Sequence, residues 1–410
     1  MPLAVIILLI TLIVIALRRV AKIIIPIWLI MASGAIAAIL CKQITPSQAI
    51  AAIEPEVMFY LLGVFFIAQA AEECGYLEYL TDKIFCYAHT GKQALFIIIF
   101  VLGTSAAFLM NDTIAIIGTP IILQLCSSHK RLIKPLLYAL AFAVTIGSAM
   151  SPIGNPQNLL IAIKGGMASP FLDFIRPLLI PTLLNLVVCY ALIFLAYKEL
   201  LNEPIEKVTP TQINDYHTMK LVRISLVLMM ILVLAKIMMD AIFSSKVINF
   251  SYIALISALP LLFSNQKWVL VKKLDWGTLI FFASTFILMQ SVWDSGFFQS
   301  NIKHYQISFM NPMVILIISI VLSQFVSNVP LVALYLPLLM HHSYSTSQLL
   351  TLGVGSTIAG NLSILGAASN IIIIQNSERR GVRGFGFLEF LKLGVPLTIC
   401  NVLIYLIFLS

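Results

Sequence analysis

Long apolar runs recur from one end of the chain to the other and limit its possible folds more than any other feature. Hydrophobic residues fill 60% of the 410 positions and charged residues only 10%, which is too little polar surface for a soluble core of this size. Because about 20 apolar residues cross a bilayer as a helix, we expect an all-α polytopic membrane protein. The apolar segments are 2–17, 22–41, 56–74, 94–127, 133–162, 171–197, 220–242, 247–264, 277–294, 305–343, 348–374 and 386–409.

Two of these segments, 94–127 and 305–343, are too long for one crossing. The first has 34 residues, and a helix of that length measures about 50 Å against about 30 Å of hydrocarbon. Each segment has a polar break near its middle, "MNDT" at 110–113 and "SNVP" at 327–330. We expect a re-entrant hairpin of two half-helices in each segment. Two full crossings per segment are the alternative.

The basic residues predict the orientation. With two re-entrant segments, ten segments cross, and 18 of the 25 Lys and Arg residues fall on one side, which the positive-inside rule makes the cytoplasmic side. Both termini are then on the outer side, in what we expect to be a bacterial inner membrane. Scattered loop residues also account for the net charge of +8 without a nucleic-acid partner. The outer side has Lys42, Lys164, Arg176, Lys246 and Lys303.

The two halves of the chain resemble each other. "FLMNDTIAIIGTPIIL" at 108–123 aligns with "FVSNVPLVALYLPLLM" at 325–340, "SPIGNPQNLLI" at 151–161 with "SILGAASNIII" at 363–373, and "FLDFIR" at 171–176 with "FLEFLK" at 387–392. The three blocks occur in the same order and at nearly the same offset. Since each half has about five crossings, an odd number, the halves would insert in opposite directions. We predict two inverted-topology repeats, 1–200 and 220–410, joined by a cytoplasmic linker at 201–219. Each has one hairpin (94–127; 305–343) and one broken helix (133–162; 348–374).

Each predicted repeat supplies two interruptions of helical structure within the membrane. Inverted repeats with broken helices build midplane substrate sites in secondary transporters, where freed carbonyls bind cations and half-helix N-termini face anions. Kinks and helix packing are the alternative for any single residue. We expect Na⁺ to bind, if it is the coupling ion, near Asn111, Asn155, Asn328 and Asn370. The predicted substrate and ion site comprises Asn111, Asp112, Thr113, Ser151, Gly154, Asn155, Asn158, Ser327, Asn328, Ser363, Gly366, Ser369 and Asn370.

Asp112 is the acidic residue that the sequence places deepest in the membrane. A carboxylate there is costly and functional by default, as a proton relay or a cation ligand; capping the second half-helix is the alternative. Its counterpart in the second half is Val329, so the two tips differ chemically. Lys236 and Asp240 are four residues apart on one helix and are expected to form a structural ion pair.

The motifs "NDTIAIIGTP", "SPIGNPQN", "SNVPLVALYLP" and "GNLSILGAASN" resemble signature regions of the ion transporter superfamily, especially its ArsB/NhaD-like and citrate-transporter-like permeases. The resemblance covers essentially the whole chain. It implies a homodimer that moves its substrate by an elevator motion, with the substrate between two hairpin tips. In the related divalent-anion/sodium symporters each tip carries Ser-Asn-Thr. Here Asn111 and Asn328 match that pattern, but the first Ser and the second Thr do not, which weakens a dicarboxylate assignment.

We therefore expect a secondary active transporter of a small anion, such as a carboxylate or an oxyanion like arsenite, coupled to H⁺ or Na⁺. A Na⁺/H⁺ antiporter without an anion substrate is the alternative, and an ion channel comes after it. No enzyme motif such as HExxH is present, so an enzyme is not expected. The chain has no phosphate-binding loop, and neither a cofactor nor a separate ATPase partner is expected. The lipid bilayer is its other partner.

Overall fold

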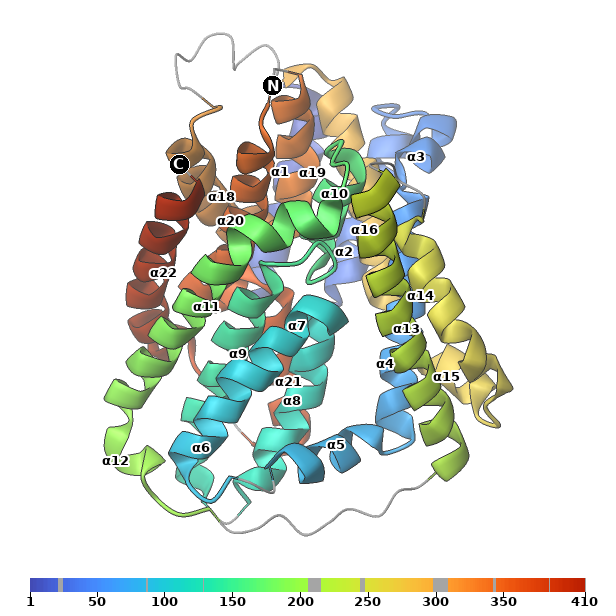
Figure 1. The fold of residues 1–410 in the computed structure, drawn as a ribbon. Helices are drawn as coiled ribbons and strands as arrows, with labels where there is room; N and C mark the ends of the chain where they lie inside the picture. The colour runs from blue at the N-terminus through green and yellow to red at the C-terminus, as the bar shows by residue number, and fades with distance from the viewer. Residues whose placement is uncertain are drawn as a thin grey trace.

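The computed structural model describes residues 1–20, 25–85, 88–127, 129–205, 215–243, 248–297, 309–341, 344–382 and 384–409. Regular structure in these ranges is helical, with an isolated antiparallel bridge between Thr90 and Pro204 (Figure 1). Seven helical stretches here are long and apolar enough to cross a membrane, which confirms the polytopic all-α membrane protein. They are α4 (Pro55–Glu73), Gly91–Leu109, Lys130–Ser148, α11 (Pro170–Ala196), α13 (Tyr216–Phe243), α16 (Trp276–Asp294) and α22 (Phe387–Leu409).

The remaining helices of the first and middle parts of the chain are shorter or less apolar. Thr45 opens one of them with a capping box, in which its side chain accepts from the Gln48 amide. These helices are α1 (Leu3–Val20), α2 (Ile27–Leu40), α3 (Pro46–Ala52), α5 (Tyr76–Phe85), α12 (Lys198–Leu201), α14 (Phe250–Ala258) with the 3-10 turn Leu259–Phe263, and α15 (Lys267–Lys273).

Both overlong segments divide at the predicted polar breaks. Segment 94–127 is divided at Met110, which has a φ of 66°, and segment 305–343 at Ser327, which has a φ of 73°. These two residues correspond in the sequence alignment of the halves. In Figure 1 the chain rises through α6 and α7 and turns back into α8. The elements are α6 (Gly91–Phe96), a π-helical stretch Ile97–Leu102, α7 (Gly103–Leu109) and α8 (Asn111–Leu125), then α18 (Pro312–Val326) and α19 (Asn328–Met340).

Segments 133–162 and 348–374 are each a helix, an irregular stretch and a second helix. The first break, residues 149–155, separates α9 (Ile133–Ser148) from α10 (Pro156–Lys164). Pro156 occupies the first turn of α10, where a missing N–H is tolerated. The second break, residues 363–367, lies between α20 (Thr346–Leu362) and α21 (Ala368–Arg379) and contains a 3-10 turn.

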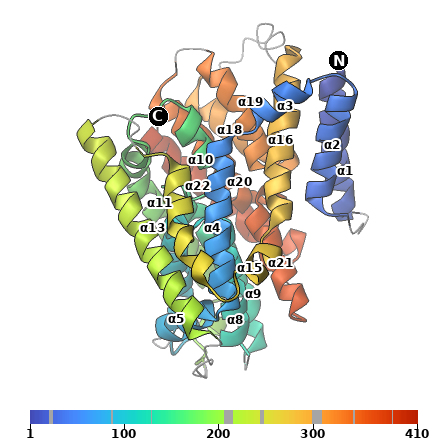
Figure 2. The ribbon, with the colours of Figure 1, turned by 90° about the vertical axis from the view of Figure 1, so that its right-hand side faces the viewer.

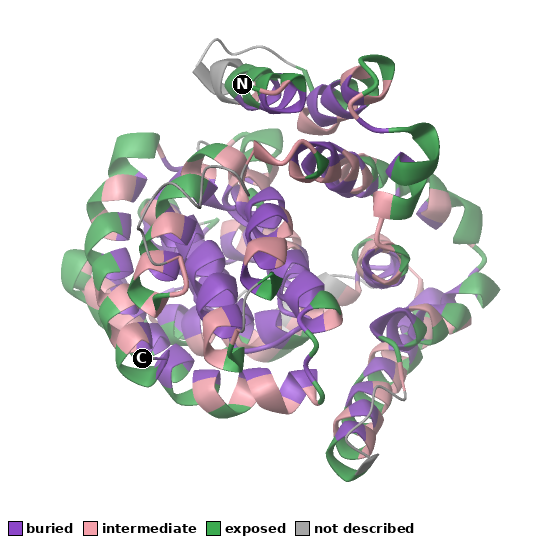
Figure 3. Ribbon diagram, turned by 90° about the horizontal axis from the view of Figure 1, so that it is seen from above, coloured by how far each residue is buried: buried purple, intermediate pink, exposed green. Residues whose placement is uncertain are grey.

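The helices form two groups. The central group contains both breaks, and α9 and α20 run through its middle almost entirely buried. Seen from above, this buried middle is surrounded by half-exposed helices, and the peripheral group lies to one side (Figures 2 and 3). The central group is α6–α11 and α18–α22, and the peripheral group is α1–α4 and α13–α16.

Glycine lets two central helices touch through their backbones. A Cβ at Gly147 of α9 would overlap the carbonyl of Gly103 in α7, so Gly147 has no room for a side chain. The helices that bear the first break and the first tip are therefore packed without intervening side chains.

The described termini lie toward one end of the molecule (Figure 1), as the predicted orientation requires. Lys42, Lys164 and Arg176 of the predicted outer set belong to the described part of the chain, whereas Lys246 and Lys303 fall outside it. The linker 201–219 is described only up to residue 205 and from residue 215.

Candidate functional site

The first break is held together by the side chains of two asparagines. Asn158 Nδ2 donates to the carbonyls of Ser148, Ala149 and Ser151 at 3.3, 3.3 and 3.0 Å. Asn155 Oδ1 accepts from the Asn158 amide at 2.9 Å and so caps α10. Both residues are fully buried. These contacts satisfy carbonyls that the interrupted helix leaves without partners.

The second break repeats this arrangement at the aligned positions of the second half. Asn370 Nδ2 donates to the carbonyls of Gly360 and Ser363 at 2.7 and 3.4 Å, the counterparts of Ser148 and Ser151. The Ser151 hydroxyl accepts from the Ile153 amide at 3.3 Å, and the Ser363 hydroxyl accepts from Leu365 at 3.1 Å. The two breaks therefore share a backbone brace as well as a sequence pattern.

Glycines close both breaks against the helix that precedes them. A Cβ at Gly154 would overlap the Ser148 carbonyl at the end of α9. A Cβ at Gly366 would overlap the Ala359 carbonyl near the end of α20. Each predicted glycine thus permits a close backbone approach rather than a left-handed turn.

The first hairpin tip lies directly against the first break. The Asn111 amide donates to the Gly154 carbonyl at 2.9 Å, while Asn111 Oδ1 accepts from the Asp112 amide at 2.9 Å. Thr113 follows and is buried. Three predicted site residues from the tip and one from the break are therefore brought together.

The second tip reaches its break through a side chain that the sequence motifs did not single out. Gln324, three residues before Ser327, accepts from the Ser363 hydroxyl at 2.7 Å. Its amide donates to the carbonyls of Ile320 and Ala359, both at 2.9 Å. The signal available in the sequence was this glutamine in the last turn of α18, a helix whose other polar residues are two serines.

Thr357 is a second residue that the motifs missed, and it joins the first break to α20, the helix that leads into the second break. Its hydroxyl in α20 accepts from Asn155 Nδ2 at 3.1 Å and from Gln157 Nε2 at 3.3 Å. Asn158 Oδ1 also faces α20, at 2.9 Å from where a Cβ of Gly353 would lie. The two broken helices thus meet face to face. In the described part of the chain no hydrogen bond joins Asn111 to Asn328.

Four acceptor oxygens of the predicted site are buried without a hydrogen-bond partner: Asp112 Oδ1, Asn158 Oδ1, Asn328 Oδ1 and Asn370 Oδ1. The Ser369 hydroxyl is also unpaired. Orphaned buried acceptors call for a water, an ion or a ligand. Of the four residues expected near Na⁺, Asn328 and Asn370 have a free carbonyl oxygen, whereas Asn111 and Asn155 use theirs on backbone amides.

Asp112 is in the first turn of α8 and makes no capping hydrogen bond, so the alternative role as a helix cap finds no support. Among the described residues no Lys, Arg or His forms an ion pair with it. A carboxylate in a membrane hairpin that has no basic partner can bind a proton or a cation.

The helices that start at the two tips and at the second break have no side-chain cap. They are α8, α19 and α21. The N-terminus of a helix has unpaired amides and a partial positive charge. Such ends can hold an anion.

The family model described as "Citrate transporter" (CitMHS) matches residues 6–351. The chain belongs to this family. Membership makes it a membrane transporter and not an enzyme, and it confirms the citrate-transporter-like resemblance of the sequence motifs.

Relatives of this CitMHS chain carry several names. A Dictyostelium discoideum protein that carries the name transporter arsB is 22% identical to this chain, over 88% of this chain and 83% of its own length. The silicon efflux transporter LSI3 of Oryza sativa subsp. japonica is 23% identical over 89% of this chain and 88% of its own. Among solved structures, MtrF of Neisseria gonorrhoeae superposes with a TM-score of 0.52 at 12% identity, covering 91% of this chain and 83% of its own. This last likeness shows a shared fold.

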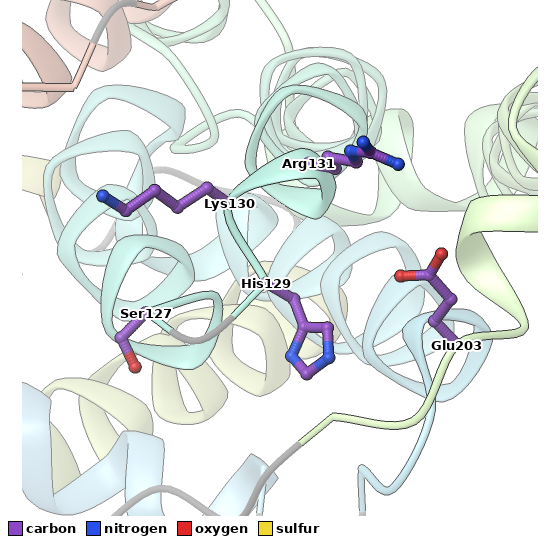
Figure 4. A pocket seen from close by; sticks show the side chains of 5 residues that line it. All are labelled: Ser127, His129, Lys130, Arg131 and Glu203. Carbon is purple, nitrogen blue, oxygen red and sulfur yellow. The ribbon is translucent and has the colours of Figure 1, made fainter.

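A separate cavity of about 440 Å³ lies in the CitMHS chain away from the breaks. Ser127, His129, Lys130, Arg131 and Glu203 line it (Figure 4). It is open, contains none of the predicted site residues, and lies beside basic loop residues of the predicted cytoplasmic side. We therefore do not assign the transport site to it.

Proposed function

We propose that the chain is a secondary active transporter of a small anion, such as a carboxylate or an oxyanion like arsenite, coupled to H⁺ or Na⁺. The observation that carries the proposal is the pairing of uncapped helix N-termini with an unpartnered acid. The ends of α8, α19 and α21 supply positive potential for an anion. Asp112 supplies one negative site for the coupling ion.

The proposal includes the architecture that such a transporter needs. We propose that residues 1–200 and 220–410 are inverted-topology repeats, because the braces of the two breaks and the two tips both match at aligned positions of the halves. Re-entrant hairpins are supported by the length of three of their four limbs, since α8, α18 and α19 have 15, 15 and 13 residues. A 15-residue helix measures about 22 Å, short of a full crossing. The remaining limb, Gly91–Leu109, has 19 residues and is long enough to cross.

In this mechanism the central group carries the substrate and the peripheral group stays fixed, as in an elevator. Free amides at the N-termini of α19 and α21 would bind the anion, since the first two amides of α8 already donate to the Gly154 carbonyl and to Asn111 Oδ1. The Asn328 and Asn370 carbonyls with Asp112 would hold Na⁺ or, at Asp112, a proton. The oxygen donors are uncharged except at Asp112, a set that suits a weakly held hard cation. A homodimer in a bacterial inner membrane, with both termini outside, completes the proposal.

Asp112→Asn tests the coupling role. In proteoliposomes supplied in turn with citrate and arsenite, an inward proton gradient should drive uptake by the native protein and not by the variant. Asp294→Asn is the matched control, because Asp294 ends α16 and its carboxylate accepts from Gln290. Unchanged pH dependence of flux in Asp112→Asn would contradict the proposal.

Na⁺/H⁺ antiport without an anion substrate is the second candidate, favoured by the free oxygens of Asn328 and Asn370 and by the unpaired oxygen of Asp112. Proton release on adding Na⁺ to anion-free proteoliposomes separates the two functions. A channel would instead show flux that does not saturate and cannot be driven uphill.

A further inference from the structure

Two asparagines that correspond in the sequence alignment of the halves bind each other. Asn185 of α11 and Asn401 of α22 are separated by the same offset that relates "FLDFIR" to "FLEFLK" at the starts of the same helices. Asn401 Nδ2 donates to Asn185 Oδ1 at 2.7 Å. Both side chains are fully buried. Each asparagine thus faces its own counterpart.

This pair continues to the second break through a third amide. Asn361 Nδ2 donates to Asn401 Oδ1 at 2.8 Å, and Asn361 lies two residues before Ser363, where the break begins. At the other end Asn185 Nδ2 donates to the Pro181 carbonyl at 2.9 Å. The three amides donate in one direction, from the second break through α22 to α11. In the contact between Asn185 and Asn401 only Asn401 donates. The two equivalent asparagines therefore have different roles.

The first break has no such link. The counterpart of Asn361 is Ala149, which has no polar side chain, and its carbonyl accepts from Asn158 Nδ2 at 3.3 Å. Among the hydrogen bonds of the described chain, none joins Asn370 to the Asn361 carbonyl. Gly394 of α22 lies against that carbonyl instead, so closely that a Cβ would overlap it. The second break therefore lacks one brace of the first and has the Asn361 side chain in its place.

Asn401 is the only described partner that Asn361 has at its side chain, because Asn361 Oδ1 is buried and unpaired. We propose that Asn401 is a positioning residue, which holds the second break in place through Asn361 and makes the two breaks unequally rigid. The inference deepens the proposed function, since it rests on the second break forming part of the site. Asn401 would then set the geometry of one half of that site without touching the substrate.

Hydrogen–deuterium exchange of the two breaks tests the positioning role without any transport assay. Asn401→Leu keeps the approximate volume and removes both amide bonds. We expect exchange in peptides covering 361–370 to accelerate about tenfold, as local opening becomes easier, and exchange in peptides covering 149–158 to stay at the native rate. Equal acceleration in both peptides would indicate general destabilisation and would overturn the proposal, as would no change in either.

Two further variants keep the test decisive. Thr398→Val is the matched control: it lies less than one turn away on α22, is buried, and its hydroxyl has no partner, so neither break should change. If Asn401→Leu does not fold, Asn361→Leu replaces it, because it removes the bond between Asn361 and Asn401 from the other side and leaves the contact between Asn401 and Asn185 in place. The exchange ratio of 362–370 to 149–158 should again rise above the native value. An unchanged ratio would overturn the proposal, whatever the flux of Asp112→Asn shows.

Discussion

Gly147 and Gly103 let α9 and α7 approach closely, whereas the equivalent helices of the second half are joined in a different way. Their counterparts are Ala359 and Ile320, whose carbonyls both accept from the amide of Gln324. Backbone contact in the first half and a glutamine bridge in the second therefore connect equivalent helices. The site is thus asymmetric at the level of single residues, as Asp112 and Val329 already indicate.

Gly147→Ala should destabilise the protein strongly. The added Cβ would overlap the Gly103 carbonyl, and overpacking a tight interface costs about 1–3 kcal/mol. Thermal unfolding in detergent should show a clearly lower midpoint. Gly386→Ala is the control, because the nearest atom to its Cβ would be 3.6 Å away; equal midpoints for the two variants would contradict the prediction.

The sequence predicts some site residues well and others not at all, for a physical reason. Asn158 and Asn370 were identifiable because both brace a backbone break, so the same residue type recurs at the same place in each half. Gln324 has no such counterpart, because the aligned residue of the first half is Ala107. Thr357 does align with a threonine, Thr145, and both hydroxyls donate to a carbonyl four residues earlier, but both lie outside the motifs that marked the breaks. The sequence also does not reveal which side-chain oxygens stay without a hydrogen-bond partner, as Asn328 Oδ1 does. That depends on the distances between atoms in the folded chain.

At the scale of elements, α13 holds a buried ion pair that fixes its neighbours. Lys236 Nζ lies 3.0 Å from Asp240 Oδ2, donates to the Ile248 carbonyl at 2.8 Å, and lies 4.8 Å from the centre of the Phe250 ring. The four-residue spacing predicted this pair correctly. Because Ile248 and Phe250 are at the start of α14, the pair ties two peripheral helices together.

Lys236→Met should be more harmful than removal of both charges. The single change leaves Asp240 buried and unpaired, which costs about 3–5 kcal/mol, whereas replacing both partners with apolar residues is often neutral. We expect Lys236→Met to lower the unfolding midpoint and Lys236→Met with Asp240→Leu to restore most of it. A double variant no more stable than the single one would contradict this explanation.

Element boundaries follow from the sequence wherever composition marks them. Pro156 and the "MNDT" and "SNVP" tips divided long apolar segments at the correct places. The short helices α3, α5, α12 and α15 were not predicted, because none of them is a long apolar run and the prediction relied on such runs. The π-helical stretch at Ile97–Leu102 is equally invisible in its purely apolar sequence.

At the scale of the whole molecule, the division into a central and a peripheral group could not be predicted. Helices distant in sequence, such as α2 with α16 and α11 with α22, pack side by side, and apolar composition does not choose between partners. For the orientation the sequence does offer a prediction, because the charges of the loops indicate which end faces the cytoplasm.

Native Cys41 offers a direct test of this orientation. It is exposed at the end of α2, which the predicted topology places on the outer side. A membrane-impermeant maleimide should label intact cells that express the native protein and should label the Cys41→Ser variant less. Introducing Lys130→Cys in that variant should restore labelling only after permeabilisation. Labelling of Cys41 that also requires permeabilisation would reverse the orientation.

The contact between Asn185 and Asn401 has a consequence for biosynthesis. At about 5–20 residues per second, a ribosome needs roughly 10–40 seconds to make the stretch of chain that separates the two. During that time Asn185 Nδ2 can already donate to the Pro181 carbonyl of its own helix, but Asn185 Oδ1 has to wait for the donor that α22 supplies. A nascent chain that stops before α22 would leave Asn185 Oδ1 and Asn361 Nδ2 without these partners together, which gives quality-control proteases a chemical mark of an unfinished transporter.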